Sequence, residues 1–262
     1  MRFLSYNLRN AGIREEQHTS VLDGWSHRRD AVLDLITKED PDVLALQEDS
    51  REQLEYIRDA FKKSHNVFLD PAFYDADNAF HAILVRNTLA VADSGAFWIS
   101  PNERVRSKID GSIRFRHATY VRLQRTDPPL RVVNVHLDHT DDQTVKQRES
   151  EVFIDLLGKI SGSPPTRTIV MGDFNYVPTT RAHFLLQDFG MLDSALLLRN
   201  HEGTFSCWTK VPPSHRIDYI WLSNDLKRVL KTYRVIRGAY CRQDGSSGCA
   251  SDHAAISADF EI

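Results

Sequence analysis

Apolar residues along this chain occur in two patterns, short continuous runs and longer stretches with helical spacing. Val43–Leu46 and Thr168–Met171 are continuous runs, which are typical of strands buried on both faces. In Thr144–Ile160 the apolar positions form one stripe, which predicts a helix. The same criteria predict further helices over Trp25–Thr37, with Ser26 as a cap, Ser50–Phe61 and Thr179–Gln187, and further strands over Arg2–Tyr6, Ala82–Val85, Leu89–Phe97, Ala118–Leu123, Arg131–Val135, Ile217–Leu222 and Ala254–Phe260.

The predicted strands and helices are interspersed from one end of the chain to the other. This mixed order favours an α/β sandwich made of two sheets with outer helices. Stretches that contain Pro and Gly, such as Ser161–Pro165 and Gly245–Gly248, are short enough to be loops within one unit. We therefore predict a single domain over residues 1–262.

The composition is that of an ordinary globular protein. Of the 262 residues, 41% are hydrophobic and 26% are charged, which excludes a disordered chain. The 33 Lys and Arg residues against 36 Asp and Glu residues give a formal net charge of −3. This balance excludes a protein that coats nucleic acid through its overall charge, although a local basic cleft remains compatible with it.

Cysteine usage and hydropathy bear on the cellular compartment of the protein. Cys207, Cys241 and Cys249 form no C-x-x-C pair, so a zinc ribbon is not supported, while a Cys241–Cys249 disulfide stays open. The chain becomes polar at Ser5, and no stretch reaches the roughly 18 to 20 apolar residues of a membrane span. We therefore expect a cytoplasmic protein with no membrane partner, and we take it to be a monomer.

Polar side chains gather where the predicted apolar strands begin or end. They are Asn7, Glu48, His136, Asp173, Asp218, Asp252 and His253. In α/β folds, ligand sites form at strand ends, where loops carry functional side chains on a rigid sheet. Each of these residues taken alone is more often a turn former or a helix cap, so only the whole set indicates a site.

The set has the chemistry needed to hydrolyse a phosphoester. Its carboxylates are Glu48, Asp173, Asp218 and Asp252. Crowded carboxylates repel one another without a cation, and hard oxygen ligands point to Mg²⁺ or Mn²⁺. The amides of Asn7 and Asn175 suit a phosphate oxygen or a water, and His136 and His253 can exchange protons with a phosphoester. A metal that polarises the phosphate and a base that orients water complete this chemistry.

Six short motifs, in one order and over nearly the whole chain, carry a family resemblance. They are Ser5-Tyr6-Asn7, Ala45-Leu46-Gln47-Glu48, Asn134-Val135-His136-Leu137-Asp138-His139, Gly172-Asp173-Phe174-Asn175, Arg216-Ile217-Asp218-Tyr219-Ile220 and Ser251-Asp252-His253. The sequence resembles the endonuclease/exonuclease/phosphatase superfamily of metal-dependent phosphoesterases. That resemblance implies a four-layer α/β sandwich, with two packed mixed β-sheets flanked by helices and the site at one edge of the sheets.

The resemblance also implies where a metal and the phosphate bind. Glu48 corresponds to the principal metal ligand, and Asn7 lies beside it, close to the metal or the phosphate. Asp252 corresponds to a residue that binds a metal directly or through water.

The catalytic roles follow the same correspondence. Asp173 corresponds to the residue that orients or deprotonates the attacking water, and Asn175 to a donor to the phosphate. Asp218 corresponds to the carboxylate that orients His253. His136 occupies the position that donates to the phosphate or to the leaving group.

One position departs from the family pattern. Members often carry an acidic residue that supports the first histidine, where this chain has Asn78-Ala79-Phe80-His81. The support of His136 therefore stays open, with Asp138 or a backbone carbonyl as substitutes. We interpret His81 as a surface residue in preference to one that faces the cleft.

Within the superfamily, the chain is most similar to a bacterial-type branch of undefined substrate. Arg116 and Arg148 match basic positions of that branch, and Arg116 is the candidate substrate clamp because a guanidinium pairs with phosphate through two hydrogen bonds. A salt bridge is the alternative for both. Trp208 and Phe205 match aromatic positions near the substrate in relatives, although Phe205 fits the core equally well.

The substrate and the activity leave alternatives. A basic run could line a nucleic-acid groove or a polyphosphate pocket, or be a solvated loop face; it comprises Arg104, Arg106, Lys108, Arg114 and Arg116. Nucleic acid and a small organic phosphate rank equally as substrates. The competing hypotheses are a catalytically silent module of the same fold that binds a phosphate ligand, and a purely structural cation site.

Overall fold

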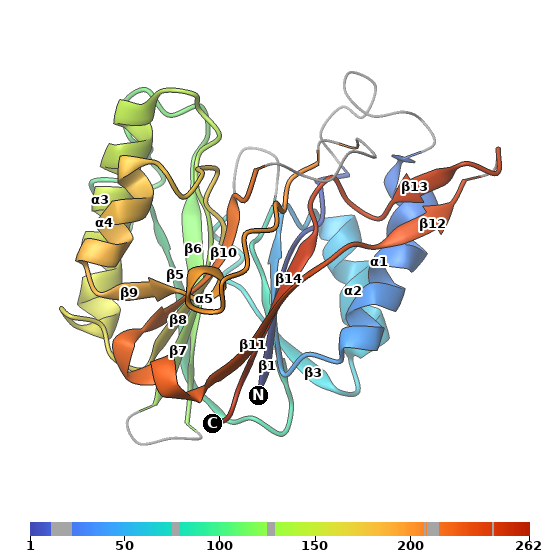
Figure 1. Ribbon diagram of the computed structural model, residues 1–262, viewed down its shortest axis with the longest axis horizontal. Helices are drawn as coiled ribbons and strands as arrows, with labels where there is room; N and C mark the ends of the chain where they lie inside the picture. Colours follow the sequence, from blue (N-terminus) through green and yellow to red (C-terminus); the bar gives the residue numbers. More distant parts are fainter. Residues whose placement is uncertain (12–22, 75–78, 125–128, 207, 209–214, 243) are drawn as a thin grey trace.

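Two packed β-sheets with helices on their outer faces make up this protein (Figure 1). The computed structural model describes residues 1–11, 23–74, 79–124, 129–206, 208, 215–242 and 244–262. Within these residues each large sheet has six strands, in the orders β11-β14-β1-β2-β4-β3 and β5-β6-β7-β8-β10-β9. The four-layer α/β sandwich expected from the sequence is confirmed.

The first sheet brings the chain's beginning and end together. Its strands are β1 (Arg2–Asn7), β2 (Val43–Gln47), β3 (His65–Phe68), β4 (Ile83–Arg86), β11 (Leu230–Ile236) and β14 (Ala255–Phe260). β1 is parallel to β2, with Asn7 opposite Gln47, and antiparallel to β14. The end of β1, the end of β2 and the start of β14 therefore lie at one edge of this sheet.

The second sheet places three of the predicted site residues in register. Its strands are β5 (Val91–Trp98), β6 (His117–Leu123), β7 (Leu130–His136), β8 (Thr168–Asp173), β9 (Met191–Asp193) and β10 (Asp218–Ser223). β7 is parallel to β8 with His136 opposite Asp173, and β10 is antiparallel to β8 with Asp218 opposite Asp173. The three side chains thus come from neighbouring strands at the same level.

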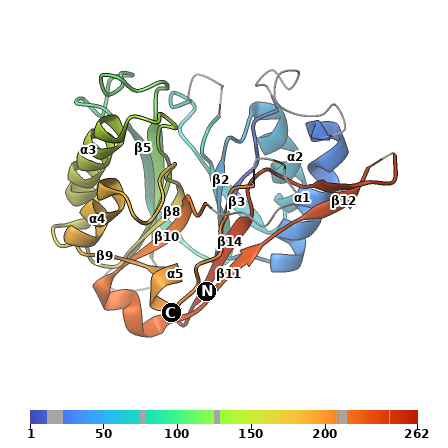
Figure 2. The ribbon, with the colours of Figure 1, turned by 45° about the horizontal axis from the view of Figure 1, so that its top comes forward.

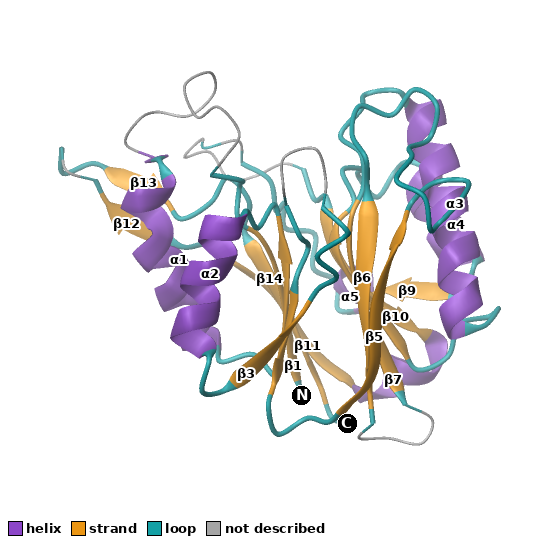
Figure 3. Ribbon diagram, turned by 180° about the vertical axis from the view of Figure 1, so that it is seen from behind, coloured by secondary structure: helices purple, strands orange, loops and turns teal. Residues whose placement is uncertain are grey.

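Apolar side chains fill the space between the sheets and under the helices. Between the sheets, Phe3, Ile83, Ile169 and Ile220 are fully buried in one cluster. On the outer faces, α1 (Trp25–Glu39) and α2 (Arg51–Phe61) cover the first sheet, and α3 (Gln143–Ser161) and α4 (Arg181–Asp188) cover the second (Figure 3). Burying both faces of each central strand explains the continuous apolar runs in their sequence.

Helix caps show where local sequence signals hold and where they fail. Ser50, the first residue of the predicted helix, caps α2, because its side chain accepts the Gln53 amide and the Gln53 side chain accepts the Ser50 amide. Ser26 does not cap α1. The cap is Gly24, Ser26 lies inside the helix, and the helix continues to Glu39, two residues beyond the predicted end.

Smaller elements lie at the margins of the sandwich. They are α5 (Ser194–Leu197), the 3-10 helix η3 (Asn224–Val229), and the two-stranded ribbon of β12 (Ala239–Cys241) and β13 (Ser247–Cys249), which projects beside α1 (Figure 1). In this ribbon Cys241 pairs with Ser247 and Cys249 with Ala239, and Cys241 is a free thiol. The disulfide left open by the sequence is thus absent, and Cys207 lies outside the described residues. None of the helices in the described ranges is long and apolar enough to cross a membrane.

Candidate active site

The predicted catalytic and metal-binding residues meet at one edge of the two packed sheets, opposite the edge that carries the chain termini (Figure 1). This edge collects the ends of β1, β2, β7 and β8 and the starts of β10 and β14. Figure 2 turns it toward the viewer, with connecting loops rising from both sheets.

Asp173 lies at the centre of the site. Its Oδ2 atom accepts a hydrogen bond from Asn7 Nδ2 at 3.0 Å and faces the Nε2 atoms of His136 and His253 at 3.5 and 3.7 Å. Its Oδ1 atom accepts the Asn175 backbone amide at 2.9 Å. Burial, reinforced by the charge of Asp218, raises the pKa of Asp173 to about 7. Asp173 is therefore a carboxylate suited to accept a proton near neutral pH.

Gly172 lets the strands that carry this centre approach one another. Its φ is +147°, and a Cβ atom at this position would lie 1.8 Å from the carbonyl oxygen of Val135 on β7. Only glycine fits such an approach. This explains the glycine of the Gly172-Asp173-Phe174-Asn175 motif in terms of the β7–β8 contact.

His253 is paired with Asp218, as the family resemblance implied. Its Nδ1 atom donates to Asp218 Oδ2 at 3.0 Å and Oδ1 at 3.2 Å. Burial alone would lower the pKa of His253, but the carboxylates of Asp218 and Asp173 outweigh it and hold the pKa well above the usual value. Phe205 packs against this imidazole with 4.8 Å between ring centroids, so Phe205 lines the site and is not a core residue.

His136 is supported by a cation in place of a carboxylate. Arg116 NH1 lies 3.1 Å from its Nδ1, and Asn175 Nδ2 lies 3.1 Å from its Nε2. Burial, together with the Arg116 charge, holds the pKa of His136 well below the usual value. Asp138 does not contact this imidazole. Its carboxylate accepts the backbone amides of Arg114 and Thr140, which shapes the loop after β7.

The interpretation of His81 as a surface residue is wrong. The side chain is fully buried, and its ring stacks on His117 at 4.2 Å with its centroid 5.4 Å from that of His136. The backbone explains this placement: Asp49 accepts the amides of His81 and Ala82, and His81 takes a positive φ of 48° that turns the chain inward. Asn78, from the same stretch, lies outside the described residues.

A second group of carboxylates adjoins this centre. Glu48 accepts hydrogen bonds from Asn7 Nδ2 at 3.3 Å and from the Asn10 amide at 2.9 Å. Burial alone would raise the pKa of Glu48, but the nearby Arg9 charge and these donors outweigh it, so the pKa is lowered. Asp252 lies 3.9 Å from the Arg9 guanidinium, and burial raises its pKa. Arg9 thus partly balances the charges of Glu48 and Asp252.

The donor set fits a divalent cation. In the described part of the chain, Asp173, Asp218 and His253 offer ligand atoms within 4.8 Å of one another. Asp252, which is buried, and Glu48, which is half-buried, add two carboxylates at the same edge. Such buried negative charge is costly without a counter-ion, and oxygen donors suit Mg²⁺ or Mn²⁺. Asn7, Glu48 and Asp252 remain the predicted ligands, since the Asp218–His253 pair already uses its facing atoms in a hydrogen bond.

Two predicted substrate residues lie apart from this centre. Arg148 is exposed on α3. Trp208 is half-buried, with its ring over the Arg28 guanidinium at 5.4 Å. Arg28 is itself buried and donates to the carbonyls of Leu8 and Ala250, so it ties the loop after β1 to the loop before β14. Trp208 therefore packs on a support of the site, and its contact with substrate stays a prediction.

The basic run predicted from the sequence divides into two parts. Arg116 is 3% exposed and lies in the site, whereas Arg104, Arg106 and Lys108 are exposed. The Arg106 guanidinium lies over the rings of Tyr74 and Phe115, at 4.9 and 4.8 Å. The exposed part is a cationic and aromatic surface, distinct from the buried site.

Three contributors were not predicted from the sequence. Arg9 lies two residues after Asn7 of the Ser5-Tyr6-Asn7 motif, and its closeness to that motif is the one available signal. His139 contacts Arg116 NH2 through Nδ1 at 3.2 Å. Lys146 donates to the Asn175 backbone carbonyl, and burial lowers the pKa of this lysine. Nothing in the local sequence distinguishes Lys146 from a solvated helical lysine.

Glu149 of α3 holds the loop that follows His136. It is 1% exposed, and its Oε2 accepts the Asp138 amide at 2.8 Å. Burial raises the pKa of Glu149 to about 8, with the Asp138 charge acting in the same direction and Arg116 and Lys146 opposing it. The folded protein therefore keeps this carboxyl protonated near neutral pH.

A pH-dependent stability follows from Glu149. Between pH 4.5, its usual pKa, and about pH 8, the folded state retains a proton that the unfolded chain releases, so stability falls as the pH rises. Glu149→Gln removes this titration. Urea unfolding at pH 5 and pH 8 is expected to show the variant gaining stability relative to the wild type at pH 8. Glu151→Gln, an exposed change on the same helix, is the control; an equal difference at both pH values would contradict the assignment.

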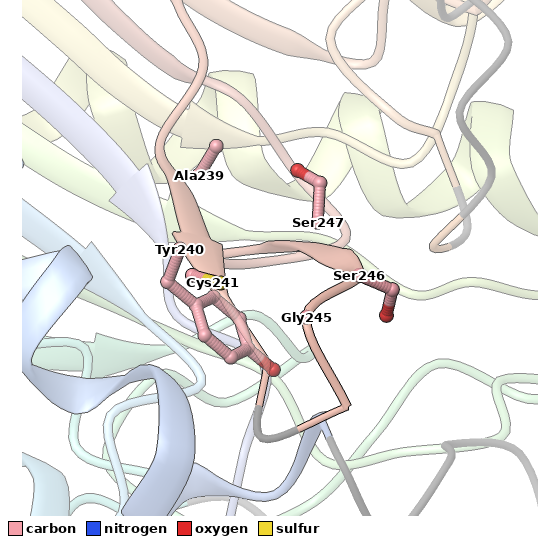
Figure 4. Close-up of a pocket in the computed structure, with 6 residues that line it drawn as sticks. All are labelled: Ala239, Tyr240, Cys241, Gly245, Ser246 and Ser247. Atoms are coloured by element: carbon pink, nitrogen blue, oxygen red, sulfur yellow. The ribbon is translucent and has the colours of Figure 1, made fainter.

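The pocket on the β12–β13 ribbon is separate from this site (Figure 4). It is lined by Ala239, Tyr240, Cys241, Gly245, Ser246 and Ser247. None of the predicted catalytic or metal-binding residues is among them, so the chemistry belongs to the strand-end edge.

Comparisons with known proteins identify the family and the fold of this chain. The profile of the Endonuclease/Exonuclease/phosphatase family matches residues 4–253. The structure is similar to the mannosyl-6-phosphatase Bt3783 of Bacteroides thetaiotaomicron VPI-5482, with 22% identity, a TM-score of 0.85 and 100% coverage of both chains. It is also similar to an endonuclease/exonuclease/phosphatase family protein from Bacteroides thetaiotaomicron (22% identity, TM-score 0.83, covering 98% of this chain and 93% of that one). The human Nocturnin catalytic domain is similar as well (18% identity, TM-score 0.73, covering 100% and 93%). No curated protein sequence matches significantly.

Proposed function

The chain belongs to the Endonuclease/Exonuclease/phosphatase family, and on this premise we propose that it is a divalent-metal-dependent phosphoesterase. It hydrolyses a phosphodiester or phosphomonoester by in-line attack of water on phosphorus. The observation that carries the proposal is a single buried carboxylate, Asp173, faced by the Nε2 atoms of two histidines. Carboxylate, imidazole and amide groups are thereby gathered around one point.

The charge state of each residue determines its role in the proposed reaction. Asp173 accepts a proton from the attacking water, because its raised pKa makes it a better base than an ordinary carboxylate. The imidazolium of His253, held by Asp218, donates to phosphate oxygens as negative charge grows on them. His136 and Asn175 supply uncharged N–H donors on the other side. A divalent cation held by Glu48 with Asn7 and Asp252 would polarise the phosphate and neutralise its charge.

The substrate is a phosphoester of nucleic acid or a small organic phosphate. A mannosyl-6-phosphatase shares this fold along its whole length, which supports including sugar phosphates among the candidates. Nocturnin and TDP2 share it at lower TM-scores. The exposed Arg106, stacked on Tyr74 and Phe115, supports an anionic substrate that extends beyond the reacting phosphate.

The test is a panel of phosphoesters assayed with Mg²⁺, Mn²⁺ or EDTA. We expect hydrolysis of at least one member, its loss in EDTA and its return with added metal. Glu48→Gln should lower kcat/KM by about 100-fold or more and raise the metal concentration needed. Glu52→Gln, an exposed change on α2, is the matched control and should behave as wild type.

The competing hypotheses give different results in the same experiment. Hydrolysis that persists unchanged in EDTA would contradict the metal dependence. A structural cation site would lower the melting temperature in EDTA with no hydrolysis of any panel member. A catalytically silent module would bind a phosphate ligand and cleave none.

A further inference from the structure

The two terminal nitrogens of the Arg116 guanidinium each contact the Nδ1 atom of an imidazole. Its NH1 lies 3.1 Å from His136 Nδ1, and its NH2 lies 3.2 Å from His139 Nδ1. The residue is 3% exposed, and its Nε lies 4.0 Å from the buried carboxylate of Asp138. The backbone carbonyl of Arg116 also accepts the Ile99 amide at 2.8 Å, which fixes the start of β6. The guanidinium is therefore held against the histidines from several sides.

This contact determines which nitrogen of His136 carries the proton. A guanidinium has only donors and stays charged, so the facing Nδ1 must offer a lone pair. The neutral ring then carries its proton on Nε2, which faces Asp173 Oδ2 at 3.5 Å. The opposite tautomer would direct an Nε2 lone pair at a carboxylate oxygen. The Arg116 contact and the Asp173 contact thus require the same tautomer.

The contact with Asn175 requires the opposite tautomer. Its Nδ2 is placed 3.1 Å from His136 Nε2 and 2.9 Å from the Leu137 carbonyl. An imidazole cannot offer lone pairs to Arg116 and Asn175 at once. The amide nitrogen has a good acceptor in Leu137, whereas the buried guanidinium cannot turn into an acceptor. The Arg116 bond therefore prevails, and the second N–H of Asn175 is left for a substrate oxygen.

The two histidines on Asp173 consequently differ in their supports. Asp218 accepts from Nδ1–H of His253, which favours a charged ring with protons on both nitrogens. Arg116 donates to Nδ1 of His136, which favours a neutral ring with one proton on Nε2. One carboxylate is thus flanked by a charged donor and by a neutral donor.

We propose that Arg116 is a positioning residue that fixes His136 as a neutral Nε2–H donor, and so gives the two histidines separate roles. Both rings donate to the phosphate through Nε2–H, but His253 is held from behind by the Asp218 carboxylate and His136 by the Arg116 guanidinium. This replaces the substrate clamp expected for Arg116, because NH1 and NH2 are both directed at imidazoles. The assignment of the tautomer stands on its own geometry, while its effect on hydrolysis rests on the proposed function.

The first test is long-range ¹H–¹⁵N correlation NMR of the histidine rings in the metal-free full-length protein. The His136 signals are identified by their loss in His136→Gln. In the wild type we expect an unprotonated Nδ1 and a protonated Nε2. A protonated Nδ1 would show that the Asn175 contact prevails and would overturn the proposal. This readout needs no substrate, so it remains decisive if no phosphoester is hydrolysed.

Variants of Arg116 give the second test. Arg116→Glu places an acceptor beside Nδ1 and should switch the proton to that nitrogen. Arg116→Gln, a neutral change kept in case the first variant does not fold, should give signals of both tautomers, and Arg116→Lys should largely restore the wild-type pattern. Arg58→Glu, an exposed change of the same charge on α2, should leave the His136 signals unchanged. An unchanged His136 tautomer in folded Arg116→Glu and Arg116→Gln would overturn the proposal.

Steady-state kinetics distinguish an Arg116 that positions His136 from an Arg116 that binds the substrate. If His136 is positioned by Arg116, Arg116→Gln should lower kcat by about 100-fold, the scale of one hydrogen-bonding catalytic group, with a change in KM below about threefold. A substrate clamp would instead raise KM and leave kcat near the wild-type value. The second pattern would contradict the positioning role.

Discussion

Replacing Asp173 with Asn is expected to lower kcat for phosphoester hydrolysis by about 10³-fold or more. The change keeps the shape of the side chain but removes the oxygen charge that faces both histidines at 3.5 and 3.7 Å. It also removes the base that accepts the proton of water, a contribution of roughly 10²- to 10⁴-fold in enzymes generally. The measurement is steady-state kinetics on the best substrate of the phosphoester panel.

The same variant should remain folded. Because burial raises the pKa of Asp173 to about 7, the charged carboxylate opposes folding above that pH, and an amide relieves this cost. In chelator at pH 8 the variant should melt no lower than the wild type. Asp188→Asn, an exposed change on α4, is the control for both assays. An Asp173→Asn protein that retains more than a tenth of wild-type kcat would contradict the role given to this residue.

Gly172→Ala is expected to cost about 4 kcal/mol of folding stability, within the range of strong backbone and packing defects. The added methyl carbon would lie 1.8 Å from the Val135 carbonyl oxygen, and the φ of +147° is rarely adopted by other residues. Relief requires β7 and β8 to separate where they carry His136 and Asp173. Urea unfolding measures the loss directly.

A second glycine separates the effect of the steric contact on stability from the effect of backbone strain. Gly245 also has a positive φ, +79°, but an added Cβ there would meet no atom within 4 Å. Gly245→Ala should therefore cost only about 1 kcal/mol, the scale of backbone strain alone. Equal losses of folding stability in the two variants would mean that the close approach of β7 and β8 does not contribute to the cost of Gly172→Ala.

The central strands could be predicted because both of their faces are buried. Val43–Leu46 and Thr168–Met171 lie inside the sandwich, so their sequences are continuously apolar and local pattern suffices. β3, β11 and the β12–β13 ribbon were not predicted. β3 and β11 are the outermost strands of their sheet and are partly exposed, so partners distant in sequence determine them more than their own pattern.

The strand-end residues of the site could be predicted, but only part of their contacts. The resemblance identified Asp218 as the partner of His253, and the structure places them 3.0 Å apart. It could not identify the support of His136, because an arginine beside a phosphate site suggests substrate binding before it suggests a histidine partner. The error on His81 has a similar origin, since the direction of a side chain after a turn depends on the backbone of that turn.

The register of β7, β8 and β10 fixes the spacing of the proposed catalytic groups independently of the loops at this edge. His136, Asp173 and Asp218 sit at matched positions of adjacent strands, so main-chain hydrogen bonding sets their spacing. Loop insertions or deletions at this edge can then alter which molecule is bound without shifting the reacting groups. Exchanging the segment that carries Arg106 and Phe115 between relatives should transfer substrate preference while the hydrolytic machinery stays the same. Such modularity makes the fold a suitable scaffold for diversifying phosphoesterases.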